Sequence, residues 1–208
     1  MREMVFADEA DEILFYIGNT PASRQMLREP IIKRIGEIVR LGYVRERGDE
    51  GYGDLGGSVN CFVHACFNLT NEQIVSLGLD EFKYMFVSPF GGFEDSSVLA
   101  AKEEMMDFVR QTGLEIEDEL VPKVLKENQY RVALYFSRGF IENMGGKDFH
   151  FLVQEKDGSW SGKCGSMTHH VDHFDKLEES LPHGPGNRYM LDSVMIVTNP
   201  YAPEEKQK

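Results

Sequence analysis

Apolar residues recur at helical spacing along the first part of the chain. Asp8 can cap a segment that Gly18 ends, and Thr20-Pro21 is a cap followed by proline at the first helical position. Pro30 is then expected to start a new helix that runs to Gly42. The apolar positions of these segments are Ile13, Leu14, Ile17, Ile31, Ile32, Ile35, Ile38 and Val39. This spacing indicates one buried face per helix and is interpreted as core.

Further helices are predicted before Gly113. Cys61 to Asn68 has the composition of a short buried helix, and Thr70 or Asn71 can cap another that runs through Leu77. Asp95 or Ser96 opens an amphipathic helix that ends at Gly113. Its apolar side carries Val98, Ala101, Met105, Phe108 and Val109.

From residue 114 onward the apolar period shortens to that of strands. Tyr130 to Phe136, Phe149 to Val153 and Asp192 to Val197 are predicted strands, and Leu114-Glu115-Ile116 is ambiguous. Asp157-Gly158 is a hairpin signal. The segment between this hairpin and Asp192 is rich in His, Asp, Pro and Gly and is predicted to be a loop.

Helices followed by antiparallel strands predict an α+β fold in which a helical N-terminal half packs on a C-terminal antiparallel sheet. The expected organisation is an N-terminal helical segment over 1–45, an α+β domain over 46–203 and a tail over 204–208.

The composition restricts the partners. A net charge of −13 argues against a nucleic-acid backbone or an anionic membrane as the main partner. Three irregularly spaced cysteines do not form a disulfide framework, and the acidic N-terminus lacks the apolar core of a signal peptide. A cytoplasmic protein is expected, or one exported as an effector by a non-cleaved route. The sequence leaves the oligomeric state open.

Cys61 is the best candidate nucleophile. It follows a glycine-rich connection (Gly48, Gly51, Gly53, Gly56 and Gly57) and stands where a helix is expected to begin. Unpaired N–H groups of a first helical turn lower the pKa of a thiol there and favour the thiolate. Cys66, further along the same helix, is interpreted as an inert core thiol, and Cys164 has no such environment.

His150 is the candidate base that takes the proton from Cys61. Strand alternation places its ring on the opposite face from Phe149 and Phe151, which suggests a ring facing a cleft or solvent. His64, three residues after Cys61, is a competing partner. Candidates for a third group that orients the imidazole are Asp148, Asp172, Asp175, Asp192 and Asn199.

Two motifs resemble a known family. Asn60-Cys61-Phe62-Val63-His64-Ala65 is similar to the Asn-Cys-Tyr-Ala-Tyr-Ala motif of a bacterial and phage group with a papain-like cysteine-peptidase fold. Its second motif is Asp-Phe-His-Trp-Tyr-Arg, an acidic-glycine turn and Trp-Ser-His-Lys-Pro-Gly. The corresponding segments here are Asp148–Val153 and Asp157–Gly165. Gly162 replaces the second histidine of that family and Cys164 its proline, which leaves a changed or lost activity open.

The resemblance implies a papain-like thiol hydrolase or peptidase that attacks an amide or ester carbonyl through an acyl-enzyme and needs no cofactor. Its substrate would be a peptide, protein or cell-wall amide. Cys61 would be the nucleophile, His150 the general base and acid, and Asp172 our choice for the orienting group. The backbone of Cys61, with Asn60 or Tyr52, would donate to the oxyanion, and Trp160 is a candidate substrate contact. No glutamine precedes Cys61 at the papain oxyanion spacing.

Two alternatives stay open. One is a non-catalytic protein-binding or inhibitor protein of effector or phage type, built on the same fold. The other is a zinc-binding protein that uses the loop His169-His170-Val171-Asp172-His173, with Cys164 and His183 nearby. These are zinc-ligand residue types, but their spacing does not match a known zinc motif, so a polar loop is the preferred interpretation.

Overall fold

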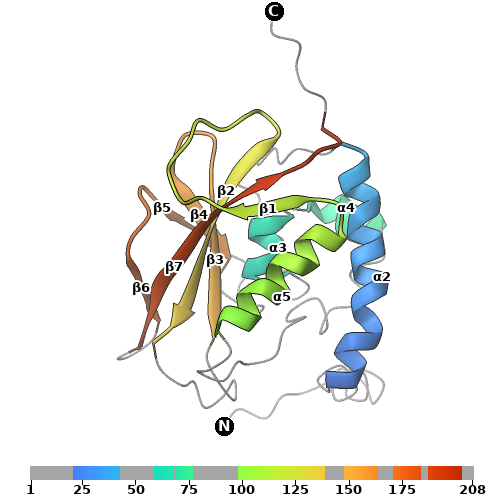
Figure 1. The fold of residues 1–208 in the computed structure, drawn as a ribbon, viewed down its shortest axis with the longest axis horizontal. Helices are drawn as coiled ribbons and strands as arrows, with labels where there is room; N and C mark the ends of the chain where they lie inside the picture. The colour runs from blue at the N-terminus through green and yellow to red at the C-terminus, as the bar shows by residue number, and fades with distance from the viewer. Residues whose placement is uncertain are drawn as a thin grey trace, which may run out of the picture.

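Every strand pairing in the structure is antiparallel, and the strands form a single sheet (Figure 1). The structure is a computed structural model and describes residues 21–42, 59–67, 69–76, 98–138, 148–163, 171–183 and 187–202. The strand order is β1-β7-β2-β3-β4-β5, and β6 also pairs with β7. The strands are β1 Glu115–Asp118, β2 Gln129–Ser137, β3 Phe149–Gln154, β4 Trp160–Lys163, β5 Val171–Phe174, β6 Ser180–His183 and β7 Asn187–Thr198.

The helices lie on one side of this sheet (Figure 1). They are α2 Pro21–Arg40, α3 Cys61–Cys66, α4 Asn71–Ser76 and α5 Val98–Gln111. The buried side chains of α5 are Ala101, Met105, Met106, Phe108 and Val109. These include four of the five positions predicted from helical spacing. Together with the strands, the helices confirm the α+β class.

Two cores lie on the two faces of the sheet. The larger lies between helices and sheet and takes Phe149, Phe151 and Val153 from β3. The smaller lies on the other face and takes Leu152 from the same strand. It is completed by Ala133, Tyr135, Trp160, Leu181 and Tyr189. The period-two alternation of β3 therefore divides its side chains between the two cores.

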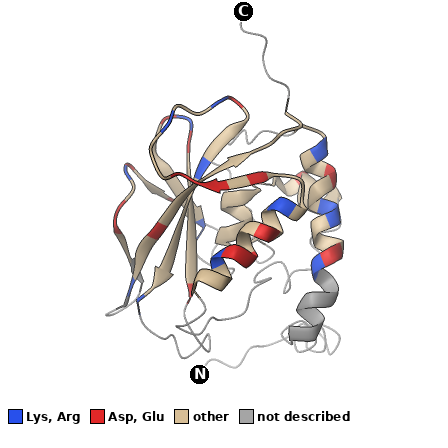
Figure 2. Ribbon diagram, viewed as in Figure 1, with Lys and Arg blue, Asp and Glu red and all other residues tan. Residues whose placement is uncertain are grey.

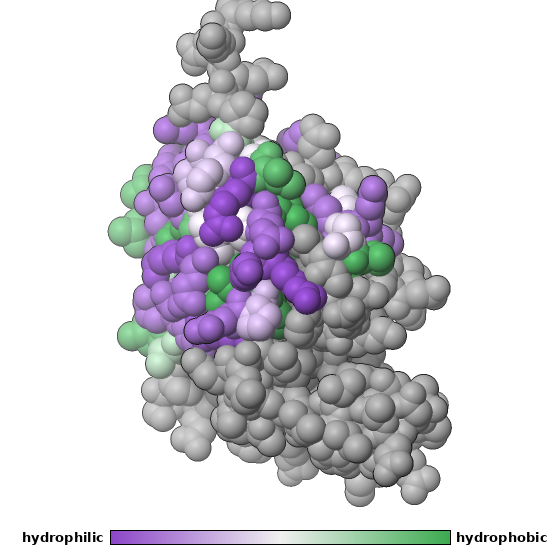
Figure 3. Space-filling model, turned by 90° about the vertical axis from the view of Figure 1, so that its right-hand side faces the viewer, coloured by the Kyte–Doolittle hydropathy of each residue, from purple (hydrophilic) through white to green (hydrophobic). Residues whose placement is uncertain are grey.

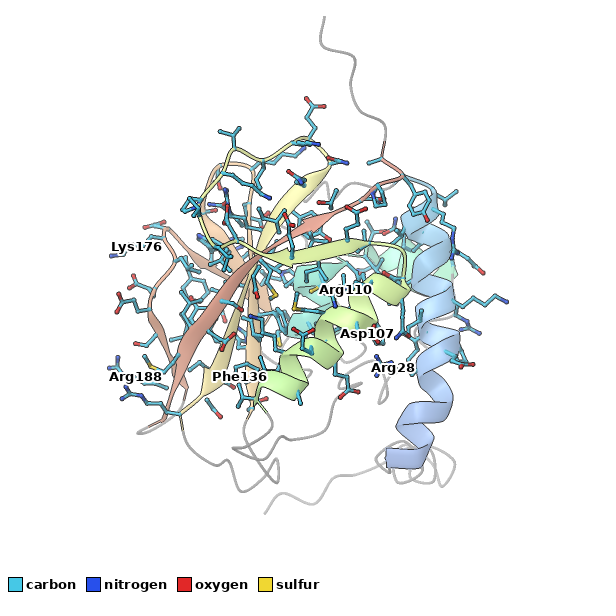
Figure 4. All side chains as sticks on the ribbon, in the orientation of Figure 1. Arg28, Asp107, Arg110, Phe136, Lys176 and Arg188 are labelled. Carbon is cyan, nitrogen blue, oxygen red and sulfur yellow. The ribbon has the colours of Figure 1, made fainter. Side chains whose placement is uncertain are left out.

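Charged residues tie α2 and α5 together. Arg28 on α2 donates to Glu104 on α5 at 2.8 Å, and its guanidinium lies 5.5 Å from the ring centroid of Phe108. Figure 4 shows Arg28 between the two helices, near Asp107. Acidic residues line β1 and the exposed side of α5 (Figure 2). The described residues on the face that carries α2 are mostly hydrophilic, with scattered hydrophobic ones (Figure 3).

Two sequence predictions are wrong. Pro30 lies inside α2 and does not start a new helix. The helix continues through Pro30, although an interior proline costs about 3 kcal/mol or more, because Ile31, Ile35 and Ile38 are buried on the helices' side. The expected loop before Asp192 contains β5, β6 and the start of β7. The predicted segment capped by Asp8 lies outside the described residues.

Candidate functional site

α3 begins at Cys61, as the sequence predicts, because Asn60 caps it. The Asn60 backbone is extended, its Oδ1 accepts from Val63 N at 2.9 Å, and its carbonyl accepts from His64 N at 3.0 Å. A side-chain acceptor at this position satisfies an N–H group that has no partner within the helix. All six residues of α3 are buried. The helix is thus anchored at the residue before the thiol and packed on all sides.

The Cys61 thiol lies against β3. Its Sγ is 4.0 Å from the carbonyl oxygen of Phe149, within reach of a weak S–H hydrogen bond. The Phe62 ring packs edge-on against Phe151, with 5.3 Å between their centroids. These contacts place the start of α3 over the first half of β3. The thiol therefore meets the peptide bond that joins Phe149 to His150.

The Phe149 carbonyl points toward the β4 side of β3. Ser137 N donates to Asp148 O at 2.9 Å, so the Asp148 carbonyl faces β2. Successive carbonyls of a strand point to opposite sides, which directs the Phe149 carbonyl away from β2. Cys61 Sγ therefore lies on the same edge of β3 as β4, which pairs with β3 further along, at Val153 and Gln154.

The His150 ring lies on the other face of the sheet from Phe149 and Phe151, as the alternation predicts. It stacks on the Tyr189 ring with 5.7 Å between centroids and an interplanar angle of 29°. His150 is only 8% exposed, so the residue is buried and does not face solvent. Its Nε2 lies 3.1 Å from the point where a Cβ on Gly162 of β4 would stand. The ring thus extends from Tyr189 toward β4.

The thiol and the imidazole consequently approach the same edge of β3 from its two faces. Cys61 Sγ lies at a carbonyl that points toward this edge, and His150 Nε2 is directed toward it. Cys61 contacts Phe149 of β3, and His150 is the next residue of that strand, with its ring on the opposite face of the sheet. Cys61 is 5% exposed, so both groups are covered.

Two of the candidate orienting groups share the His150 face. Asp148 stands two residues before His150, just ahead of β3, and its Oδ2 accepts from the Tyr189 hydroxyl at 2.5 Å. Asp172 of β5 is paired across from Gly162, so it projects to the same face one strand further away, where it is exposed.

The other three candidates lie elsewhere. Asp192 pairs with Lys102 on α5 at 3.6 Å. The Asn199 amide donates to Val39 O at 3.2 Å and ties the end of the sheet to α2. Asp175 is exposed in the turn after β5. Asp192 and Asn199 therefore bind residues of the helices, Lys102 and Val39.

The remaining site predictions have mixed outcomes. Asn60 serves as the N-cap, which uses its amide oxygen. Trp160 is 5% exposed in the smaller core, which leaves little of its side chain for a substrate. Tyr52 lies outside the described residues. His64 is fully buried in α3, and Cys66 is a core thiol whose carbonyl accepts from the Tyr130 hydroxyl.

The zinc alternative finds no support among the described residues, which contain no group of three or more potential metal ligands. Asp172 and His173 are neighbours on β5 and therefore project to opposite faces of the sheet. Cys164, His169 and His170 lie outside the described residues, as does the side chain of His183.

Sequence reasoning missed two residues near the candidate site. Tyr189, which stacks on His150, lies in the part of β7 that was predicted as loop; the alternation of Tyr189 and Leu191 is the signal that would have extended the strand. Lys163 ends β4 and is fully buried on the α3 side, opposite Val171. Lysine is rarely buried, so the sequence gives no sign of this position.

The chain matches no protein-family model and no curated protein. Among the described helices, none has the length and apolar character needed to cross a membrane.

Proposed function

We propose that this protein is a papain-like thiol hydrolase that acts on an amide or ester carbonyl, with Cys61 as nucleophile and His150 as general base and acid. The observation that carries this proposal is the contact of Cys61 Sγ with the Phe149 carbonyl, next to His150. A nucleophile on the first turn of a helix and a base on a neighbouring strand are the two parts that thiol catalysis requires.

The proposed reaction passes through an acyl-enzyme. The Sγ of Cys61 attacks the carbonyl carbon as its proton moves to His150, and His150 then gives this proton to the leaving amine or alcohol. Water next attacks the thioester carbonyl and gives a proton to His150, which returns it to the departing Cys61 sulfur. The products are a carboxylic acid and the amine or alcohol, and no cofactor takes part.

Local contacts support these roles. The first-turn N–H of Cys61 lies beside the sulfur and is a natural donor to the oxyanion. Asp148 and Asp172 supply negative charge on the face that holds His150, which favours the imidazolium formed in the first step.

The decisive experiment is the pH dependence of cysteine alkylation by iodoacetamide, measured for each cysteine by peptide mass spectrometry. Cys61 should react well below the ordinary thiol pKa of about 8.5, while Cys66 and Cys164 should not. The variant His150→Ala should slow Cys61 at low pH, whereas His173→Ala, which removes an exposed histidine of β5, should not. Equal behaviour of all three cysteines, or no effect of His150→Ala, would rule out the activated dyad.

A second function, binding of a protein partner, is favoured by the segment between β1 and β2. Leu120, Val121 and Val124 are 91%, 74% and 95% exposed there. The backbone between them is tied at Lys123, whose N–H donates to Glu119 Oε1 at 3.0 Å. An ordered segment with exposed apolar side chains is typical of a protein contact.

This second function is tested with the double variant Leu120→Ser/Val124→Ser. A physiological partner should bind the wild type and Cys61→Ala with equal affinity and should not bind the double variant. If a partner binds the double variant as tightly as the wild type, this segment is not the contact.

A further inference from the structure

We propose that Tyr189 is the positioning residue for His150 and that Asp148 holds Tyr189 in place. The consequence for catalysis rests on the proposed thiol hydrolase function. The structural part of the proposal concerns only the orientation of one imidazole ring and can be measured without turnover.

The first link is the carboxylate of Asp148. Its Oδ1 accepts from Phe149 N at 2.8 Å and its Oδ2 accepts from the Tyr189 hydroxyl at 2.5 Å. The backbone on both sides is also fixed, since Asp148 N donates to Ser137 Oγ at 2.9 Å. Because one oxygen is held by Phe149 N, the carboxylate cannot rotate freely, and its other oxygen offers the Tyr189 hydroxyl one fixed acceptor.

The second link is the Tyr189 ring. It is 5% exposed and packs in the smaller core, where Leu181 is its partner across β6 and β7. With its hydroxyl bound and its ring enclosed, Tyr189 presents a fixed aromatic face. The His150 ring lies on this face at a separation typical of stacked pairs.

The third link is the space over Gly162. A Cβ at this position would stand 2.3 Å from Leu152 Cδ2 and 3.1 Å from His150 Nε2. Glycine therefore leaves room for the Nε2 end of the ring. Tyr189 on one side and Gly162 on the other fix the direction in which Nε2 points, which is toward β4.

The stack also favours the protonated ring. When His150 takes the proton of Cys61, it becomes an imidazolium on the face of Tyr189, and cations are attracted to aromatic faces. Among the described residues, the titratable and charged groups on this face include Asp148 just before β3, Tyr135 and Arg131 on β2, Tyr189 on β7 and Asp172 on β5. Glu119 is bound to Arg131, and the Glu178 carboxylate acts on Tyr135. Cys61 approaches from α3. Loss of the Tyr189 ring should thus lower the pKa of His150 as well as release the ring.

The test uses the full chain labelled with ¹⁵N-histidine and the variants Tyr189→Phe and Tyr189→Leu. Long-range ¹H–¹⁵N correlations report the tautomer, the order and the pKa of His150, assigned by comparison with His150→Gln. Tyr201→Leu, which removes a half-exposed tyrosine outside the smaller core, is the matched control. The rate of Cys61 alkylation is measured in parallel.

Tyr189→Leu should broaden or shift the His150 signals, lower its pKa and slow Cys61 alkylation at low pH by roughly ten- to a hundredfold, the cost of a misplaced catalytic group. Tyr189→Phe keeps the stack and loses only the bond to Asp148. Its His150 signals and its rate of Cys61 alkylation should therefore stay close to those of the wild type. Tyr201→Leu should change neither. This order, wild type then Phe then Leu, would support positioning by the ring.

Unchanged His150 signals in Tyr189→Leu would overturn the inference, even if Cys61 is activated. If Tyr189→Leu does not fold, the folded Tyr189→Phe variant tests the Asp148 link, and signals and rate both identical to wild type would overturn that link. Failure of the proposed function is a different result. In that case His150 responds to Tyr189→Leu, but Cys61 of the wild type shows no His150-dependent reactivity.

Discussion

Cys61 Sγ lies 4.0 Å from the carbonyl oxygen of Phe149, a residue 88 positions later in the chain. The contact joins the first residue of α3 to the strand that carries His150. Because α3 is buried on all sides, the position of the thiol depends on how this short helix begins and packs. Changes at either end of the contact should therefore affect stability and thiol reactivity in separable ways.

Asn60 can be tested for two roles at once. Asn60→Ala removes the cap on Val63 N and should lower the free energy of unfolding by about 1 kcal/mol. Asn60→Asp keeps an acceptor for the cap but removes the amide donors. If the Asn60 amide stabilises an oxyanion, Asn60→Asp should retain the stability in urea and lose turnover of an ester substrate. Equal loss of stability in both variants would contradict the capping role.

Gly162 is predicted to tolerate no side chain. Gly162→Ala places a Cβ 2.3 Å from Leu152 Cδ2 in the smaller core, so it should destabilise the fold by about 1–3 kcal/mol and displace the His150 ring. Gly158→Ala is the contrasting control: it meets no atom within 4 Å, and its φ of +91° adds only backbone strain. Urea unfolding and histidine NMR distinguish them, since only Gly162→Ala should shift His150. An unshifted His150 in Gly162→Ala would contradict the packing described.

The parts of the fold that were predictable from sequence are those with a strong local pattern. The apolar spacing of α5 and the glycine with φ of +98° after it, Gly113, define one helix. The alternation of β3 and the Asp157-Gly158 turn define the hairpin to β4. In each case residues close in the chain carry the information, so periodicity and turn chemistry suffice.

The parts that were missed depend on partners far along the chain. β5 exposes Asp172 and His173 and is a strand because it pairs with β4. Pro30 remains helical because the residues after it are buried on the helices' side of the sheet.

The features of the candidate site also fall into those set by local sequence pattern and those set by distant partners. The helix start at Cys61 and the facing of His150 followed from local pattern, whereas the Tyr189 stack depends on pairing between β7 and β2 that no short motif encodes. Their roles in catalysis remain predictions.

The ion pair between Arg131 and Glu119 should make stability depend on acid pH. Arg131 Nε donates to Glu119 Oε2 at 2.7 Å, and the Glu119 side chain is only 5% exposed. The hydrogen bond from Arg131 holds the pKa of Glu119 below its ordinary value, against the opposing effect of burial. A carboxyl with a lowered folded pKa stabilises the fold above its unfolded pKa of about 4.3, and this contribution is lost as the pH falls through the folded value.

Arg131→Met should therefore cost about 1.5–3 kcal/mol at neutral pH, and the difference from wild type should shrink below about pH 4. Lys176→Met is the control, because the pair of Lys176 with Glu178 at 3.5 Å is exposed and should contribute at most about 1 kcal/mol. Urea unfolding from neutral to acid pH measures both. A cost of Arg131→Met that stays constant through the acid range would show that packing, not the ion pair, is lost.

Tyr135 should make stability depend on alkaline pH. Its side chain is fully buried, and its hydroxyl donates to Glu178 O at 2.7 Å. Burial first, and then the Glu178 carboxylate, raise the pKa of Tyr135 above its ordinary value of about 10. Unfolding then releases a proton once the pH exceeds the unfolded pKa, so wild-type stability should decline steadily above about pH 10.

Tyr135→Phe removes the hydroxyl and leaves the Glu178 carbonyl without this donor, which should cost about 1 kcal/mol at neutral pH. It should also remove part of the alkaline decline, so the stabilities of variant and wild type should converge or cross as the pH rises. Tyr201→Phe, at a half-exposed tyrosine, should keep the wild-type slope. Urea unfolding at pH 7 and at several values above pH 9 provides the comparison. Parallel pH curves for Tyr135→Phe and wild type would mean that Tyr135 ionises as readily in the folded protein as in the unfolded chain, contrary to its burial.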